Sequence, residues 1–419
     1  MIDLKYIRAN PELIRKAIKN KNEKADLDAL LKADEERRSL QYKFDNLKAQ
    51  QNTVSQVIAS KKRAKESAAD EIAEMGEVAA EIKSIQTDLS KSNTLVEALL
   101  LAIPNIPQAD VPIGRDESLN EVIRHEGELP QHDFPLKDHL DIATINSLLD
   151  LPRGAKISGS GFPIYTGFGA KLERALINFM LEYHIQKHGY TELMVPLAVN
   201  RKTMTGTGQL PKLEEDMYHI DEDDLFLIPT AEVPVTNIYA DEVLQYKDLP
   251  QKFVAYTPCF RREAGSYGKD TRGLQRLHQF NKVEMVRFVL PEDSEAALCE
   301  MLQDAEDILK AFGLHYRVLS LCTGDLSFAS QKTYDLEVWA PGSQKYLEVS
   351  SVSNFGEFQA RRANIRYKDA EGKLRHLHTL NGSGVATPRL MIALLETCQQ
   401  ADGSLKLPDV LRPWLELKI

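Results

Sequence analysis

Two stretches near the N-terminus repeat apolar residues at alternating steps of three and four. The first contains Leu30, Ala33, Leu40, Phe44, Leu47, Val54 and Ile58, with Arg37 and Gln51 at two further steps. The second, after a break near Ser67, contains Ile72, Met75, Ala79, Ile82, Leu89, Val96 and Leu100, with Gln86 and Asn93 as polar steps. This spacing is typical of the seam between paired helices. We therefore predict an antiparallel coiled-coil arm over about residues 28–101, with helices of about 30 to 35 residues that span roughly 50 Å.

A proline-rich segment separates this arm from the rest of the chain. Pro104, Pro107, Pro112, Pro130 and Pro135 stand among polar residues, and prolines at this density stop helices. We expect an N-terminal domain over residues 1–103, a linker over 104–135 and a second domain over 136–419. A chain of 419 residues is long enough for two domains.

The second domain mixes helical and strand patterns. Leu172, Leu176, Phe179 and Tyr183 mark one face of a helix that Gly189 would end, and a strand is expected over residues 190–196. Further strands are expected over 252–262, 274–290, 315–321, 333–340 and 345–353, and helices over 291–312 and 388–400. Successive strands without intervening helices predict an α+β fold, an antiparallel sheet flanked by helices. The chain lacks both a GxGxxG after an N-terminal strand and a GxxxxGK[ST], which disfavours Rossmann and P-loop sites.

Charge is distributed unevenly along the chain. The 52 basic and 62 acidic residues give a net charge of −10, which argues against a wholly basic nucleic-acid-binding protein. Residues 37–65 nevertheless hold eight basic side chains and one acidic side chain, Asp45. This basic face is either a solvated coiled-coil surface or a phosphate-binding surface for RNA. Four scattered cysteines, a charged N-terminus and the lack of an 18-residue apolar run lead us to expect a cytoplasmic protein without a signal peptide or a membrane partner.

The segment that is most informative about function lies at residues 260–280. Phe260-Arg261-Arg262-Glu263 ends one apolar run, a turn rich in glycine and charge follows, and His278-Gln279-Phe280 begins a second run. An arginine fork can bind phosphate or carboxylate through two hydrogen bonds. An aromatic ring at the start of the second run can lie on a base. Two strands and a loop of this design can hold a nucleoside triphosphate.

Two later segments carry further candidate groups. In Tyr346-Leu347-Glu348-Val349-Ser350, alternation along a strand places Glu348 and Ser350 on one face and Val349 on the other. A carboxylate and a hydroxyl directed at one place suit magnesium, which prefers oxygen ligands. Near the C-terminus, a glycine-rich stretch over 381–384 leads through Pro388 to Arg389 at the start of an apolar helix.

These segments resemble the three motifs of the class II aminoacyl-tRNA synthetases. Residues 260–280 are similar to motif 2, the helix and strand that end at Pro196 to motif 1, and the segment that ends at Arg389 to motif 3. The N-terminal arm, Thr230-Ala231-Glu232 and residues 206–211 narrow the resemblance to the seryl-tRNA synthetases of bacterial type, from the first residues to about residue 400. It implies activation of L-serine with ATP and Mg²⁺ to seryl-adenylate. It also implies transfer of the seryl group to the 3′-terminal adenosine of tRNA(Ser), and of tRNA(Sec), by a homodimer.

The resemblance also implies roles for individual residues. The catalytic residues would be Arg261, Glu348 and Arg389. The ATP-binding residues would be Arg261, Arg262, Glu263, Leu277, Phe280, Glu348, Val349, Ser350, Ser351 and Arg389. The serine-binding residues would be Thr230, Ala231, Glu232, Arg261, Glu284 and Ser383. Glu348 and Ser351 would hold the metal. The tRNA-binding residues would be Arg37, Lys43, Lys48, Lys61, Lys62, Arg63, Lys269 and Arg272.

Two other interpretations stay open. A synthetase-like enzyme could pass its amino acid to a carrier protein, but such a protein would lack a basic N-terminal arm. A non-catalytic relative could serve as an RNA-binding regulator, and it would tolerate the loss of Arg261, Glu348 or Arg389, all of which are present. Many class II enzymes have a glycine or an aromatic residue just before the motif 3 arginine. Pro388 departs from that pattern and leaves the local turn open.

Overall fold

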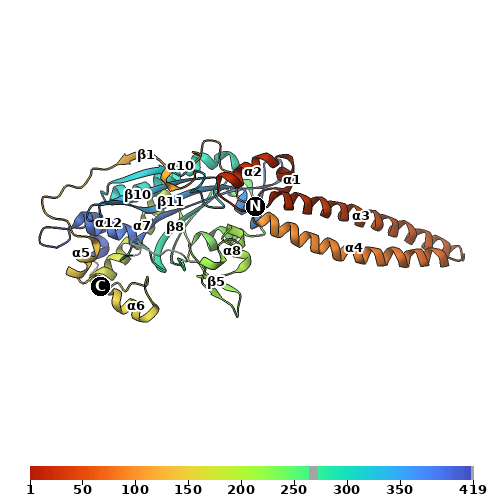
Figure 1. Cartoon of the computed structure of the whole chain (residues 1–419), viewed down its shortest axis with the longest axis horizontal. Coiled ribbons are helices and arrows are strands. Elements are labelled where there is room, and N and C mark those ends of the chain that lie inside the picture. The colour runs from red at the N-terminus through yellow and green to blue at the C-terminus, as the bar shows by residue number, and fades with distance from the viewer. Residues whose placement is uncertain (264–271, 417–419) are drawn as a thin grey trace. The chain divides into compact units, whose positions relative to one another are not determined.

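The computed structural model describes residues 1–263 and 272–416. The chain forms two compact units (Figure 1). The first comprises Ile2–Lys19 and Glu23–Pro104, and the second comprises Asn105–Ile419 together with Met1 and Asn20–Asn22. In the described part of the chain, no helix is both long and apolar enough to cross a membrane.

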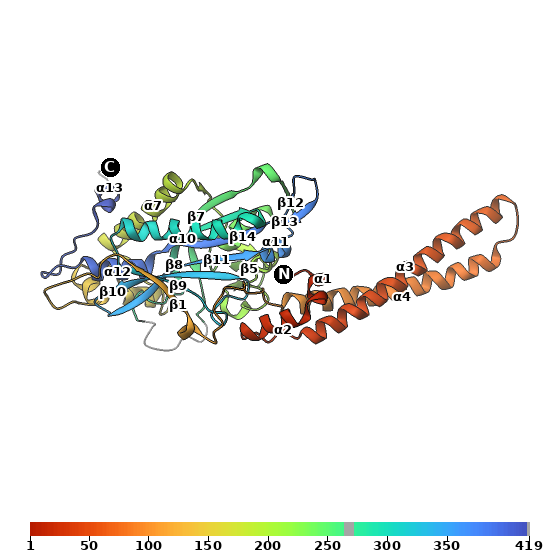
Figure 2. The ribbon, with the colours of Figure 1, turned by 90° about the horizontal axis from the view of Figure 1, so that it is seen from above.

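The first unit is helical. Two short helices, α1 (Leu4–Ala9) and α2 (Pro11–Asn20), precede the long helices α3 (Leu27–Arg63) and α4 (Ala69–Leu101). The two long helices lie side by side along their lengths, as Figures 1 and 2 both show. Asp26 begins α3 because its side chain accepts a hydrogen bond from the Ala29 N–H. The predicted helical hairpin is therefore confirmed.

The predicted seam is right in α3 and wrong in part of α4. In α3 the buried seam includes Leu30, Ala33 and Val54, as expected. In α4 the buried residues are Val78, Ile82, Ile85, Leu89, Val96 and Leu100. The predicted positions Ala79, Gln86 and Asn93 are exposed, and Ile72 is 51% exposed. The seam advances by three residues after Met75 rather than by four, so Val78 and Ile85 face α3.

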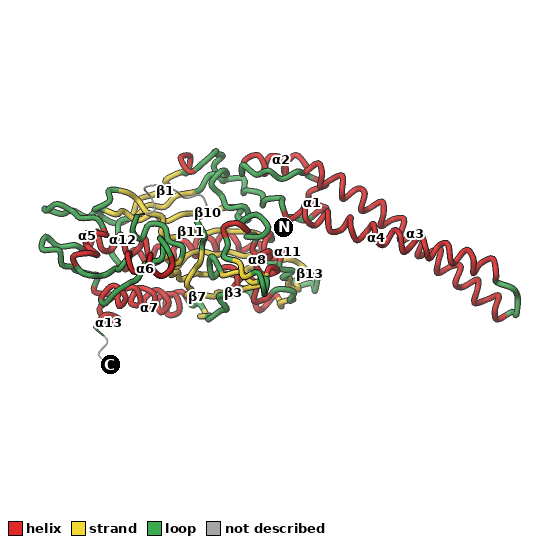
Figure 3. Tube along the Cα trace, turned by 60° about the horizontal axis from the view of Figure 1, so that its bottom comes forward, coloured by secondary structure: helices red, strands yellow, loops and turns green. Residues whose placement is uncertain are grey.

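The second unit is built on one main sheet, whose strands are yellow in Figure 3. It has eight strands in the order β1-β9-β10-β11-β14-β8-β7-β2. The strands are β1 (Glu121–Glu126), β2 (Thr191–Glu192), β7 (Gln251–Phe260), β8 (Gln279–Val289), β9 (Tyr316–Ser320), β10 (Lys332–Ala340), β11 (Lys345–Gly356) and β14 (His378–Ala386). Every neighbouring pair is antiparallel except β2 and β7. The predicted α+β class with an antiparallel sheet is confirmed.

Two strands of the main sheet occupy segments for which no strand was predicted. β1 lies within the expected linker 104–135 and pairs with β9, so this stretch contributes to the second unit. β14 contains Asn381-Gly382-Ser383-Gly384, the glycine-rich stretch that was expected to lead to a helix. Its glycines permit close packing, since a Cβ on Gly382 would lie 2.9 Å from a methyl group of Val352. The strand expected over 190–196 is correct in place but is limited to β2.

Helices cover the sheet. α7 (Phe168–His188) packs on β7 and β8 and ends at Gly189, whose φ of 70° is left-handed, as predicted. α10 (Ser294–Ala311) packs on β11 and β14, and α12 (Thr387–Cys398) packs on β8, β10 and β11. The shorter helices are α5 (His139–Ile145), α6 (Leu151–Ser158), α8 (Arg201–Thr207), α9 (Glu232–Thr236), α11 (Phe358–Arg362) and α13 (Arg412–Leu415).

Two small sheets complete the second unit. One has the order β3-β5-β4 and the other the order β13-β12-β6. Their strands are β3 (Ala198–Asn200), β4 (His219–Ile220), β5 (Leu225–Leu227), β6 (Val243–Gln245), β12 (Arg366–Lys368) and β13 (Leu374–His376). The first of these sheets leads through Ile228 and Pro229 to α9, and so positions Thr230 and Glu232 beside the main sheet.

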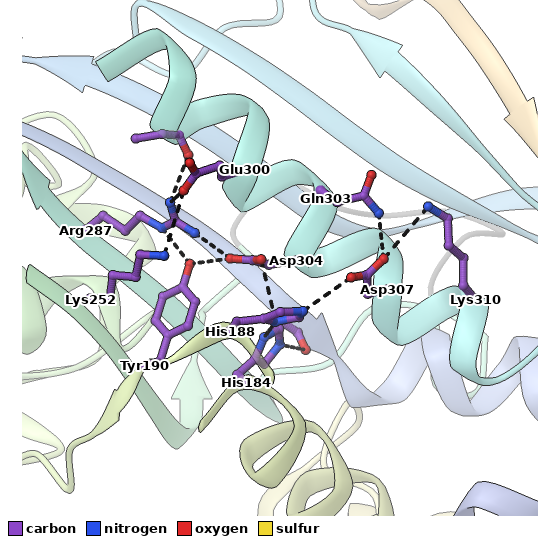
Figure 4. Close-up of polar contacts among 12 residues, drawn as sticks. His184, His188, Tyr190, Lys252, Arg287, Glu300, Gln303, Asp304, Asp307 and Lys310 are labelled. Carbon is purple, nitrogen blue, oxygen red and sulfur yellow. Dashed lines mark hydrogen bonds and ion pairs between the residues drawn. The ribbon is translucent and has the colours of Figure 1, made fainter. Parts of the chain in front are cut away.

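A buried polar network ties α7, β8 and α10 together (Figure 4). The Arg287 guanidinium is 1% exposed and donates to Asp304 at 2.5 Å, to Glu300 at 2.8 Å and to the Tyr190 hydroxyl at 2.7 Å. His184 extends the network to β14, where its Nε2 lies 3.4 Å from the Gly384 carbonyl oxygen. Burial and the neighbouring His188 lower the pKa of His184 to about 3, so His184 is neutral and can donate to this carbonyl.

Removing the cation of this network should destabilise the protein. We expect Arg287→Met to lower the free energy of unfolding by about 3–5 kcal/mol, because Asp304 would be left as a buried charge without its guanidinium. Lys310→Ala is the control. Lys310 lies on α10, as Asp304 does, but it is 44% exposed and lies 3.9 Å from Asp307. The control should cost less than about 1 kcal/mol. Urea unfolding measures the free energy of unfolding of each variant. Equal losses in the two variants would contradict the stabilising role given to Arg287.

Candidate active site

One pocket gathers residues from β8, β11, β14, the start of α12 and the segment that follows β7. Arg261, Glu348 and Arg389 all line it, although they come from three segments that are far apart in the sequence. Leu277, Phe280, Val349, Ser350, Ser351, Glu263 and Ser383 line the same pocket. The sheet order explains this convergence, because β11, β14 and β8 are consecutive neighbours.

A second pocket adjoins the first at Arg261. It is lined by Gln209, Leu213, Asp216, Met217, Pro229, Thr230, Glu232, Arg261, Glu263 and Arg276. The Arg261 Nε donates to the Pro229 carbonyl at 3.3 Å, and the guanidinium lies 5.2 Å from the centroid of the Phe280 ring. These contacts hold an arginine fork where it can meet ligands in both pockets.

Arg389 is fixed from two sides. Its Nε donates to the Gln275 carbonyl at 3.1 Å, and its Nη1 donates to the Glu348 carbonyl at 2.9 Å and lies 3.6 Å from the Glu348 carboxylate. Pro388 stands in the first turn of α12, a position that suits its fixed φ. The local turn that Pro388 left open is therefore a regular helix start, which aims Arg389 back over β11.

The alternation predicted for β11 is wrong at Val349. Leu336 pairs with Ser350 and Glu337 pairs with Glu348, so Val349 is an extra residue in β11. The bulge brings Glu348, Val349, Ser350 and Ser351 all to the lining of the first pocket. Ser350 is almost fully buried and donates to the Ser383 carbonyl at 2.5 Å.

Oxygen groups gather beside this bulge. Asp335 pairs across the sheet with Ser351, and its Oδ1 is buried without a hydrogen-bond partner among the described residues. Burial and the nearby Glu348 carboxylate raise the pKa of Asp335 well above its usual range. Within the described ranges, no group of three or more His, Cys, Asp or Glu side chains could hold a metal ion.

Buried polar groups line the junction of the two pockets. Thr230 Oγ1 accepts hydrogen bonds from Lys282 Nζ at 2.8 Å and from the Glu232 N–H at 3.2 Å. Lys282 Nζ also lies 2.8 Å from Glu284 Oε2, to which Ser383 Oγ donates at 3.3 Å. Glu232 accepts from Gln359 at 2.6 Å. Burial and the neighbouring Glu284 raise the pKa of Glu232 to about 7.

Two family models match this chain. The N-terminal domain model of the seryl-tRNA synthetases matches residues 1–107, and the class II core domain model for the G, H, P, S and T enzymes matches residues 213–398. The serine–tRNA ligase of Desulforapulum autotrophicum is 51% identical over 416 residues, which cover 99% of this chain and 97% of that protein. This chain belongs to the seryl-tRNA synthetase family.

Other members of the seryl-tRNA synthetase family are similar to this chain over its full length. The serine–tRNA ligase of Thermodesulfovibrio yellowstonii is 51% identical over 423 residues, which cover 100% of both chains. The crystal structure of the Pyrococcus horikoshii seryl-tRNA synthetase complexed with ATP is 34% identical, with a TM-score of 0.92. It covers 100% of this chain and 99% of that chain.

The residues expected to bind substrates differ in whether they line the pockets. Arg262 is exposed, and its backbone N–H donates to the Asp216 carbonyl at 3.0 Å. Ala231 is fully buried, so only its backbone could meet a ligand. Glu263 lines both pockets, but its carboxylate lies 3.3 Å from Arg276 and its φ is 49°. Ser383 and Lys282 line the first pocket, and Glu284 lies behind them.

The residues expected to bind tRNA fall into two groups. Lys43, Lys48, Lys62 and Arg63 are exposed on α3. Arg37 instead lies 2.8 Å from Asp34, which is fully buried and also contacts Arg8 at 2.7 Å and Arg38 at 3.2 Å. Lys61 is paired with Glu71 across the hairpin.

Two further tRNA candidates belong to the second unit. Arg272 lies 3.4 Å from Asp138, and its side chain is 67% exposed. Lys269 lies outside the described residues. The contact of Arg272 with Asp138 is one that an incoming phosphate would have to replace.

Several pocket residues were not predicted. Lys282, Gln275, Arg276 and Asp335 line the pockets or support their walls. A signal for Lys282 was present in Lys282-Val283-Glu284-Met285, where two charged residues alternate with two apolar residues. Every residue of β8 from Lys282 to Val289 is buried, and charges there need partners. Asp335 carries no comparable signal in the sequence.

Proposed function

We propose that this protein is a serine–tRNA ligase that activates L-serine with ATP and transfers it to the 3′-terminal adenosine of tRNA(Ser). The observation that carries the proposal is the convergence of Arg261, Glu348 and Arg389 on one pocket that adjoins a second pocket lined by Thr230 and Glu232. The 34% identical Pyrococcus horikoshii enzyme crystallised with ATP supports the ATP site. Arg261 lines both pockets, an arrangement that suits a reaction in which the carboxylate of one substrate attacks a phosphorus atom of the other.

The geometry suggests how each group acts in the first step. Activation brings two anions together, the serine carboxylate and the α-phosphate, so it needs fixed cations and alignment. Arg261 reaches both pockets and would hold the carboxylate and the α-phosphate in one fork. Phe280 and Leu277 would contact the adenine, and Glu263 would accept from its amino group. Arg389 would hold the far end of the triphosphate.

We also propose that Mg²⁺ serves this site. Glu348 and Ser351 supply oxygen donors, and the unpartnered Asp335 Oδ1 stands beside Ser351, so the residues present fit a hard cation. Magnesium is commonly held by one or two carboxylates together with substrate phosphates. When bound, the ion would neutralise charge on the triphosphate, while Arg261 and Arg389 align it.

The remaining parts of the proposal concern partners and organisation. The N-terminal domain, residues 1–103, would bind tRNA through the exposed basic side chains of α3, and residues 136–419 would form the catalytic domain after a linker over 104–135. The resemblance extends the substrate range to tRNA(Sec). A homodimer is supported by Met194, which is 98% exposed in the motif 1 segment. Four free cysteines fit a cytoplasmic location.

The pKa of Glu232 predicts a pH dependence for serine binding. The serine ammonium group needs an ionised partner, and Glu232, with a pKa of about 7, is mostly protonated below that pH. The KM for serine should therefore rise about tenfold between pH 8 and pH 6, as expected for one group titrating near pH 7. Pyrophosphate exchange across this range measures it. Glu232→Gln should raise the KM and flatten its pH profile, and an unchanged slope in that variant would contradict the assignment.

One assay tests the proposed function directly. Exchange of labelled pyrophosphate into ATP is measured with each of the twenty amino acids in turn, and exchange should require serine. Charging of tRNA(Ser) and tRNA(Sec) transcripts is then measured with labelled serine. Exchange without charging would favour an enzyme that serves a carrier protein, and absence of exchange would favour a non-catalytic RNA-binding role.

A further inference from the structure

Lys282 is a buried cation beside the candidate serine-binding residues Thr230 and Glu284, and it has no role in the motifs described above. Its side chain is 8% exposed, yet it lines the first pocket. Its ammonium group donates to Thr230 Oγ1 and to Glu284 Oε2, each at 2.8 Å. An ammonium group carries three donors. Among the described residues, the third donor of Lys282 has no partner.

The surroundings of Lys282 limit what its third donor can meet. Thr230 and Glu284 take two of its three donors. Lys282 lines the first pocket, which Arg261 and Ser383 also line, so a ligand in this pocket can supply the third acceptor. An unsatisfied buried ammonium donor is costly, so a ligand that supplies an acceptor at this point would be favoured.

We propose that Lys282 is a specificity-determining residue whose third N–H donates to the side-chain hydroxyl of the bound amino acid. The inference rests on the proposed function, since it names the group that reads serine. Lys282 Nζ and Glu284 Oε2 form a donor and an acceptor 2.8 Å apart, and one hydroxyl oxygen can contact both. A hydroxyl is the small group that both donates and accepts.

This pairing predicts which amino acids Lys282 distinguishes. Alanine has a methyl group in place of the hydroxymethyl group, so it would leave the ammonium donor without a partner, and a site built for a hydroxyl rejects such an analogue strongly. Threonine keeps the hydroxyl and adds a methyl group, so its exclusion depends on space and not on Lys282. Lys282 should therefore govern discrimination against alanine and leave discrimination against threonine unchanged.

The test compares Lys282→Met with a matched buried lysine of the same sheet. Lys332 on β10 is 7% exposed at its side chain and pairs with Asp110 at 2.7 Å and Glu295 at 2.5 Å, outside both pockets. Lys332→Met thus removes a similar buried charge without touching the site. In the full-length protein we measure the KM and kcat for serine in pyrophosphate exchange, the inhibition constants of L-alanine and L-threonine, the KM for ATP and thermal unfolding.

Lys282→Met should lower kcat/KM for serine about 10- to 100-fold, the value of one hydrogen bond to a charged group. The alanine inhibition constant should change less than twofold, and the KM for ATP should stay constant. Lys282→Gln should recover part of the loss, because an amide still donates. Lys332→Met should preserve all these constants even where thermal stability falls.

Two outcomes would overturn the inference. A parallel loss for serine and alanine would show that Lys282 only supports the pocket or contacts the carboxylate that both share. If Lys282→Met weakened discrimination against threonine more than discrimination against alanine, Lys282 would contact a part of the substrate other than its hydroxyl group. If Lys282→Met does not fold, the same comparison is made with Lys282→Gln. Absence of serine-dependent exchange in the unaltered protein would instead refute the proposed function.

Discussion

Replacing Arg261 with alanine is expected to slow serine-dependent pyrophosphate exchange by about 10²- to 10³-fold, the usual effect of removing one preorganised electrostatic contact to a transition state. Arg261 lines both pockets and is held by the Pro229 carbonyl and the Phe280 ring. The change therefore removes the cation placed between the carboxylate and the phosphate. The loss should fall mainly on kcat, because charge on the reacting phosphate increases in the transition state.

The control for Arg261 is an arginine in a similar local setting. Arg317 lies 4.2 Å from the Tyr346 ring centroid and 2.6 Å from Glu337, on a strand of the same sheet, but it is not a lining residue of either pocket. Arg317→Ala should keep exchange within about twofold. Arg261→Lys should recover little, because an ammonium group lacks the planar fork. Near-normal exchange by Arg261→Ala would refute the role assigned to it.

The candidate site was predicted well where function depends on side-chain type and spacing. Arg261, Glu348 and Arg389 could be proposed because each stands in a short segment that resembles a class II motif, and the structure brings the three together. Arg262 could not be separated from Arg261, because two adjacent arginines look alike until the strand end shows which one faces the pocket. Lys282 and Asp335 act through partners that are distant in sequence, Thr230 for one and Ser351 for the other, and spacing alone does not reveal such pairs.

The fold was predicted correctly where the apolar residues repeat regularly. It was missed where strand pairing overrides the local amino-acid composition. The long helices α3, α4 and α7 follow from their repeats, and the interior strands from their apolar runs. β14 was missed because Asn381 to Gly384 have turn-like composition, whereas pairing with β11 and β8 on both sides satisfies their backbone groups. The bulge at Val349 depends on the register of β10 against β11, which a single strand sequence does not specify.

Shortening the arm is expected to separate the two steps of the reaction. In the variant, residues 41–88 are replaced by a short glycine-containing turn, so that Asp34 keeps Arg8, Arg37 and Arg38. Pyrophosphate exchange should stay within about twofold, because the residues described as lining the two pockets all lie between positions 209 and 389. Charging of tRNA(Ser) should fall in kcat/KM by about 100-fold or more, since several basic side chains that pair with phosphates would be removed together.

A finer variant distinguishes charge from shape in the same arm. Lys43, Lys48, Lys62 and Arg63 are exposed on α3, whereas Lys61 is paired with Glu71. Changing the four exposed residues to glutamine should reduce the salt dependence of tRNA binding by up to about 0.7–0.9 log units for each phosphate that the protein no longer neutralises. Lys61→Gln alone is the matched control and should change the slope less, since its charge is already balanced by Glu71. If the shortened arm charges tRNA normally, or if the four-residue variant keeps the full salt slope, these side chains do not bind the phosphates of tRNA.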